Sequence, residues 1–204
     1  MKPSEVSYPA AEQQPLADDC RACPALCAAR TRISWGNGPT DARLFVVGEA
    51  PAAGDPEADR WRGGNHTGAA YTSRTSGRKV RALVADAGYA GDAYYTNAVK
   101  CHPPDNRDPT AEERANCRSW LQQEVEMVDP AVLLPTGKHA TRSILALAGR
   151  ELDGFLDAVL EPTETAVGTV VPLLHPSYQE VWLSRLGHTR ASYVETLADC
   201  LDSR

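Results

Sequence analysis

Four cysteines stand at spacings that suit a metal centre. Cys20 and Cys23 form a C-x-x-C pair, and Cys101 and Cys117 lie sixteen residues apart in a second region of the chain. Thiolates gathered from two such regions are typical ligands of a [4Fe–4S] cluster or of an all-cysteine zinc site, and the spacing favours neither. Ordinary buried thiols are the alternative interpretation.

Three further residues could do acid–base or hydrogen-bonding chemistry. Glu49, Asn97 and His175 each stand at the end of a short apolar run that is rich in β-forming residues. Ligands of parallel sheets bind at the carboxyl ends of the strands. We therefore expect these three side chains to converge on one site. The segment 49–75, rich in Gly and Pro and too long for a simple connection, is predicted to be a functional loop.

The elements that must position these residues alternate between strand and helix. Strands are predicted at 42–48, 93–100, 131–135 and 170–174, and helices at 76–88, 109–128, 138–148 and from about 190 onwards. Thr110 and Glu113 form a capping box at the start of the second helix. The alternation predicts the α/β class: a single three-layer α/β/α domain with a central four-stranded, mainly parallel sheet. We expect this domain to span 18–204, after a flexible N-terminal segment at 1–17.

Composition limits the class of protein. The chain of 204 residues is 42% hydrophobic, which suffices for one buried core. It has no apolar run that could span a membrane and no signal-peptide core, so we expect a cytoplasmic protein. Disulfides are rare in that compartment, which favours metal ligation. Cys27 and Cys200 have no partner at metal spacing, and we expect each to be a small buried residue.

The charge is uneven. A formal net charge of −6 argues against a nucleic-acid partner, since phosphates favour basic surfaces. However, seventeen arginines stand against four lysines, and arginine is the better bidentate ligand of phosphate. A local basic groove on an acidic protein is compatible with this composition.

Several motifs together resemble one family. The motifs are Gly48-Glu49-Ala50-Pro51, the segment 67–77, the run T-N-A-V-K-C-H-P-P-D-N at 96–106 followed by Cys117, and His175-Pro176-Ser177. In this set the chain resembles the iron–sulfur uracil-DNA glycosylases from about Asp18 to the C-terminus. Glu49 and His175-Pro176-Ser177 are similar to family 4 of that superfamily. The stretches 50–53 and 74–77 are similar to family 5, which has a broader substrate range.

The resemblance implies an activity and two catalytic residues. It implies a monofunctional DNA glycosylase that flips uracil out of DNA, hydrolyses its N-glycosidic bond and leaves an abasic site. Glu49 would orient or polarise the attacking water and favour the positively charged sugar of the transition state. His175 would donate a hydrogen bond to O2 of the departing base. No lysine is placed as a Schiff-base nucleophile, which excludes a lyase step.

The resemblance also implies the binding residues. The base would be held by Ala50, Pro51, Tyr71 and Asn97, with Tyr71 stacking on the ring and Asn97 distinguishing uracil from cytosine. The DNA contacts implied are Arg74, Lys100, Pro176, Ser177 and Tyr178, with His102 and Arg107 as further phosphate contacts. The cofactor implied is a structural [4Fe–4S] cluster on Cys20, Cys23, Cys101 and Cys117.

Three alternatives stay open at this point. The first is a glycosylase for other deaminated bases such as hypoxanthine or xanthine. The second is an iron–sulfur DNA-binding protein without catalysis, and the third is a zinc site in an unrelated α/β protein. The expected partner is uracil-containing DNA, single- or double-stranded, bound by a monomer that makes no membrane contact.

Overall fold

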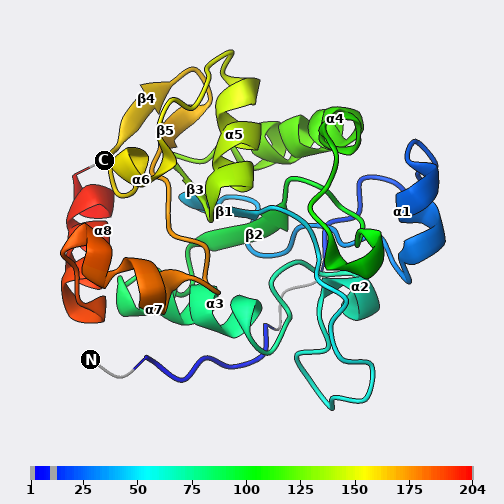
Figure 1. Cartoon of the computed structure of the whole chain (residues 1–204), viewed down its shortest axis with the longest axis horizontal. Helices are drawn as coiled ribbons and strands as arrows, with labels where there is room; N and C mark the ends of the chain where they lie inside the picture. The colour runs from blue at the N-terminus through cyan, green and yellow to red at the C-terminus, as the bar shows by residue number, and fades with distance from the viewer. Residues whose placement is uncertain (1–2, 10–12, 204) are drawn as a thin grey trace.

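The computed structural model describes residues 3–9 and 13–203, and its centre is a twisted five-stranded sheet (Figure 1). The strands are β1 (Leu44–Gly48), β2 (Ala93–Asn97), β3 (Val132–Pro135), β4 (Thr163–Thr165) and β5 (Gly168–Val170). Their order in the sheet is β2-β1-β3-β5-β4. All pairings are parallel except that of β4 with β5. The predicted α/β class with a mainly parallel sheet is confirmed.

The helices follow the predicted alternation. They are α1 (Pro24–Ala29), α2 (Gly64–Thr67), α3 (Ser76–Asp86), α4 (Ala111–Val128), α5 (Lys138–Leu147), α6 (Phe155–Ala158), α7 (Gln179–Trp182) and α8 (Arg190–Asp202), with short 3₁₀ turns at Pro104–Asn106 and Ser184–Leu186. The predicted capping box begins α4, where Thr110 Oγ1 accepts from Glu113 N and the Glu113 carboxylate accepts from Thr110 N. None of the helices in the described residues is long and apolar enough to cross a membrane.

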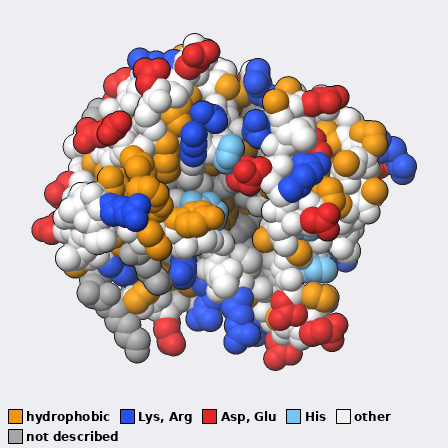
Figure 2. Space-filling model, viewed as in Figure 1, with side chains coloured by type: hydrophobic (Ala, Val, Ile, Leu, Met, Phe, Trp, Pro, Cys, Tyr) orange, Lys and Arg blue, Asp and Glu red, His pale blue; other side chains and the backbone are white. Residues whose placement is uncertain are grey.

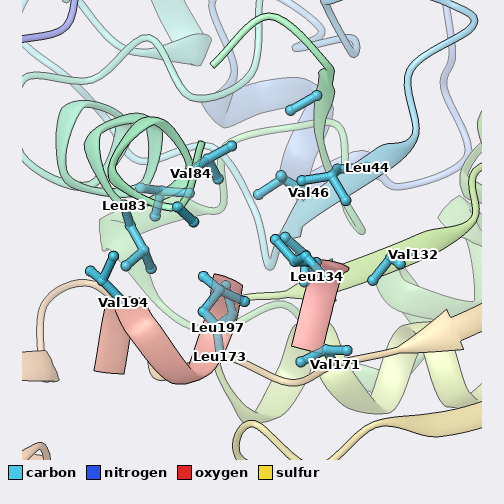
Figure 3. Packing of buried hydrophobic residues seen from close by; sticks show 14 of the residues in the cluster. Leu44, Val46, Leu83, Val84, Val132, Leu134, Val171, Leu173, Val194 and Leu197 are labelled. Atoms are coloured by element: carbon cyan, nitrogen blue, oxygen red, sulfur yellow. The ribbon is translucent and has the colours of Figure 1, made fainter. Parts of the chain in front are cut away.

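Two hydrophobic cores, one on each face of the sheet, make the domain three layers thick. On one face, α3 and α8 pack against Val46 of β1 and Leu134 of β3 (Figure 3). On the other face, α4 and α5 cover Phe45 and Val47. Because both faces are covered, all five residues of β1 are buried, which explains its continuous apolar sequence.

The sheet has one strand more than the four predicted. β4 was not predicted because its three residues, Thr-Glu-Thr, lie at the sheet edge, are not buried, and show no apolar alternation. The strand predicted at 170–174 is shifted as well. β5 ends at Val170, and Pro172 has no N–H to continue the ladder. Val171 N and Leu173 N still donate to carbonyls of β3, so the chain runs beside that strand towards its carboxyl end.

The N-terminal segment predicted to be flexible contacts the domain where it is described. Gln14 N donates to Gly36 O over 2.8 Å. The ring of Tyr8 lies edge-on to that of Trp61, with centroids 5.3 Å apart. These contacts hold the segment against the stretch before β1 and against the loop that follows β1.

A buried ion pair joins α4 to the end of β2. Lys100 Nζ donates to Glu124 Oε2 over 2.5 Å and to Asn97 O over 2.6 Å, and both charged side chains are at most 1% exposed. Glu124 Oε2 also accepts from Thr96 Oγ1, and its Oε1 accepts from Gly36 N. The prediction that Lys100 contacts DNA phosphates is therefore wrong, because its ammonium group is fully committed inside the protein.

Removal of one partner of this ion pair should strongly destabilise the folded protein. We expect Glu124→Ala to lower the free energy of unfolding by about 3–5 kcal/mol, because it leaves the Lys100 charge buried without its counter-ion. Glu126→Ala, on the exposed side of the same helix, is the control and should change stability by less than about 0.5 kcal/mol. Urea denaturation measures both, and equal losses for the two variants would contradict this assignment.

Candidate active site

A cavity of about 840 Å³ opens at the carboxyl ends of the parallel strands. It is lined by nine of the residues predicted to form the site: Glu49, Ala50, Pro51, Tyr71, Asn97, His175, Pro176, Ser177 and Tyr178. Figure 2 shows a hollow near the middle of this face, with histidine side chains inside and apolar, acidic and basic side chains around it. The parallel register explains the convergence, since Gly48 lies directly beside Asn97.

The floor of the cavity requires a glycine at position 48. A Cβ atom there would lie 2.5 Å from Asn97 Oδ1 and 3.0 Å from Tyr71 Oη. Tyr71 is held by a 2.7 Å hydrogen bond between its hydroxyl and Thr136 Oγ1, and its ring lies edge-on to that of Tyr95. Its backbone is left-handed (φ 54°), which is a strained conformation for an aromatic residue.

Glu49 follows β1 and is held in a poorly solvated position. Its side chain is 20% exposed, and Oε1 is buried without a hydrogen-bond partner. Burial raises the pKa of this carboxyl from 4.5 to about 7; Asp108 reinforces the shift and Arg114 opposes it. A carboxyl with a pKa near neutrality has the ionisation behaviour of a general base that works at neutral pH.

His175 lies in the segment after β5 with its tautomer fixed. Ser177 N donates to His175 Nδ1 over 3.2 Å, so the neutral ring carries its proton on Nε2. Burial lowers the pKa of His175, and Asp108 only partly opposes this shift. The arrangement gives a neutral hydrogen-bond donor. Gly137 allows the close approach of this ring, because its φ is 94° and a Cβ there would lie 3.1 Å from His175 Cβ.

Two residues of the cavity were missed from the sequence. His139 Nδ1 lies 4.0 Å from Glu49 Oε1, and His139 Nε2 lies 3.4 Å from Asp108 Oδ2. His139 stands in the first turn of α5, where its place in the helical pattern gives no sign of a site. Asp108 lies in a polar loop, and only the fold brings it beside Glu49.

The predicted DNA contacts divide into exposed and internal residues. Tyr178 is 59% exposed at the cavity rim, and Arg74 is exposed in the loop before α3, although it does not line the cavity. The prediction for His102 is wrong, because the residue is buried with Nδ1 3.1 Å from Pro51 O. Arg107 lines the cavity but forms a two-fold hydrogen-bonded ion pair with Glu113, so its guanidinium already has a partner.

The cysteines gather beside the loop that carries Glu49. Cys23, Cys101 and Cys117 are buried in a third cluster of side chains, with Leu26 and Val99, and Cys20 is half-buried. Ala50, the residue after Glu49, packs against this cluster. Two donors point at its sulfurs: Arg30 Nη1 lies 3.1 Å from Cys101 Sγ, and Asn116 Nδ2 lies 3.5 Å from Cys23 Sγ. The cysteine cluster (Cys20, Cys23, Cys101 and Cys117) thus adjoins the cavity.

Comparison with known proteins decides the family. The sequence profile of the uracil DNA glycosylase superfamily matches residues 35–200. The chain belongs to the uracil DNA glycosylase superfamily. The resemblance that the motifs predict is therefore confirmed. The match runs from before β1 into α8 and includes every residue that lines the cavity.

Relatives in the superfamily come from both branches that the motifs suggest. A type-5 uracil-DNA glycosylase of Pyrobaculum aerophilum is 33% identical over 212 aligned positions, which cover 90% of this chain and 86% of the relative. A type-4 uracil-DNA glycosylase of Thermotoga maritima is 34% identical over 161 positions, covering 78% and 77%. A type-5 uracil-DNA glycosylase of Mycobacterium tuberculosis is 30% identical, covering 87% and 76%.

The raised pKa of Glu49 has a consequence for the stability of this superfamily member. When the pKa of a carboxyl rises on folding, the folded protein becomes less stable as the pH increases from the unfolded pKa to the folded pKa. For Glu49 this range runs from 4.5 to about 7. We expect Glu49→Gln, which stays neutral, to unfold at the same temperature as the wild type near pH 4 and at a higher temperature above about pH 7. Calorimetry across this range measures the difference. A gain that is independent of pH would argue against the raised pKa.

Proposed function

We propose that this protein is a monofunctional uracil-DNA glycosylase that hydrolyses the N-glycosidic bond of deoxyuridine in DNA and acts as a monomer. The observation that carries this proposal is the pairing of a Glu49 carboxyl with a neutral His175 donor around one cavity that adjoins Asn97. The names of its relatives support uracil as the base.

The cavity offers what this hydrolysis needs. The nucleotide must leave the helix before an enzyme can reach its glycosidic bond. The bond then breaks towards a sugar with oxocarbenium character and a base that carries negative charge. His175 Nε2–H can donate to O2 of the departing base, and an ionised Glu49 can stabilise the cationic sugar and accept a proton from water.

Recognition of uracil is assigned to Asn97. Its amide can donate to O4 and accept from N3–H, whereas cytosine presents the opposite pattern at these two atoms. Tyr71 supplies an aromatic ring in the same cavity, in a position suited to stacking on the base. Tyr178 and Val181, which are 59% and 54% exposed, are apolar groups near the rim that could press on the DNA beside the vacated position.

An oligonucleotide assay tests the function. The wild type should leave alkali-labile abasic sites at uracil, and Glu49→Gln and His175→Ala should each slow single-turnover excision by about 100-fold or more. Glu57→Gln, which changes an exposed carboxylate of the same loop, should act like the wild type. Binding of DNA without excision would favour the non-catalytic alternative. Hypoxanthine and xanthine substrates measure the breadth of specificity.

We further propose that the cysteine cluster holds a [4Fe–4S] cluster. The buried thiols and the two donors that face them suit such a group. Among the described residues, no three cysteine sulfurs lie within 4.8 Å of one another. Sulfurs around zinc stand about 3.8 Å apart, given a Zn–S distance of about 2.3 Å, so a zinc ion would require the thiols to move together. When bound, it would tie α1 to α4 and support Ala50, and its role would be structural.

Metal analysis of anaerobic preparations tests this proposal. The wild type should contain iron rather than zinc and absorb broadly in the violet, and Cys117→Ser should lose most of the iron and some of its thermal stability. Cys27→Ser is the matched control, because its hydroxyl can still donate to Cys20 O as the Cys27 thiol does. Stoichiometric zinc in the wild type, or full iron in Cys117→Ser, would overturn the assignment.

A further inference from the structure

His139 stands between two carboxylates at the edge of the cavity. Its Nδ1 faces Glu49 Oε1 at 4.0 Å, and its Nε2 faces Asp108 Oδ2 at 3.4 Å. The two ring nitrogens thus point at different carboxylates. The three groups lie within 4.8 Å of one another, but a single cation could use only one of those nitrogens, so the geometry suits a relay of hydrogen bonds better than a metal site.

The two atoms that face each other across the gap are both unsatisfied. Glu49 Oε1 and His139 Nδ1 are each buried, and neither has a hydrogen-bond partner. Buried polar atoms without hydrogen-bond partners are unfavourable, because they have lost water without gaining a replacement. A separation of 4.0 Å is too long for a direct bond between them. One water oxygen at about 2.8 Å from both atoms would satisfy both at once.

The ionisation of the ring suits an acceptor at Nδ1. Burial lowers the pKa of His139, which keeps the ring neutral near pH 7; Asp108 acts in the opposite direction. With its proton on Nε2 and directed at Asp108, the neutral ring presents a lone pair at Nδ1. The other charged groups that lower the pKa of the ring are Lys138, Arg142 and Arg114, because their positive charges disfavour protonation of His139.

We propose that His139 is a further catalytic residue, which binds the attacking water together with Glu49, and that Asp108 is the positioning residue that fixes its ring. This inference rests on the proposed glycosylase function. As the C1′–N1 bond breaks, its electron pair leaves with the base, and the water oxygen forms the new bond to C1′. The water's proton passes to the Glu49–His139 pair and from there to solvent, while the base anion takes up a proton from solvent.

Two variants of His139 separate the roles of its nitrogens. Asn places a polar atom near the position of Nδ1, whereas Gln reaches the position of Nε2 and keeps only the contact with Asp108. In single-turnover excision with saturating enzyme, we expect His139→Gln and His139→Ala to be slowed by about 100-fold. His139→Asn should keep a larger share of the rate. Arg142→Ala removes an exposed charge that faces the ring from the same helix, and at about pH 8, where the ring is neutral in both proteins, it should excise like the wild type.

The pH dependence distinguishes catalysis from a merely structural role. If an ionised Glu49 and a neutral His139 are both needed, each adds one power of the proton concentration to the fall of the wild-type rate at low pH. In His139→Ala the order should be lower by one, because Glu49 and His175 titrate in both proteins and only the contribution of His139 is lost. An unchanged order in this variant, or equal rates for the Asn and Gln variants, would overturn the inference while uracil excision by the wild type stands.

Two other outcomes are also decisive. A wild type that leaves uracil in place would overturn the proposed function, and this inference with it. Inhibition by Zn²⁺ that disappears in His139→Ala and in Asp108→Asn, with unchanged rates in chelator-treated buffer, would assign the three groups to a cation site instead.

Discussion

The ion pair between Lys100 and Glu124 connects the parts of this protein that have to act together. A single carboxylate accepts hydrogen bonds from β2, from the segment before β1 and from the lysine that precedes Cys101. The same lysine donates to the backbone carbonyl of Asn97, and it thereby holds the residue to which recognition of the base is assigned. Such a pair adds little stability over an apolar substitute, but it specifies one arrangement, because any displacement leaves a charge buried without its partner.

Burial is the main cause that shifts the pKa values of the two main ionisable groups of the cavity in opposite directions. It raises the pKa of Glu49 and lowers that of His175, because in each case the low-dielectric surroundings disfavour the charged form. The two shifts leave a range above about pH 7 in which the carboxyl is ionised and the imidazole is neutral. A hydrolysis that needs an anion on one side and a neutral donor on the other can use that range. Asp108 contributes to both environments, although it was not recognised from the sequence.

Local signals in the sequence predicted the fold well. The capping box at Thr110 fixed the start of α4, and the apolar runs located β1, β2 and β3 to within a few residues. The failures came from contacts between distant parts of the chain. Lys100 looks like a surface lysine until Glu124, twenty-four positions later, is folded against it. His139 fits an ordinary helical pattern, and only the packing of α5 beside β1 brings it to Glu49. The motifs pointed to nine of the residues that line the cavity, and the three-dimensional structure shows that Lys100 and His102 are internal.

The tautomer of His175 depends on a backbone amide, that of Ser177, rather than on another side chain. Every amino acid except proline supplies this group. The orientation of the imidazole proton is therefore almost independent of which residue evolution places at position 177, as long as the loop keeps its shape. The side chain at position 177 can therefore vary with the DNA that it contacts. The imidazole donor in the cavity is kept as long as the backbone keeps its course.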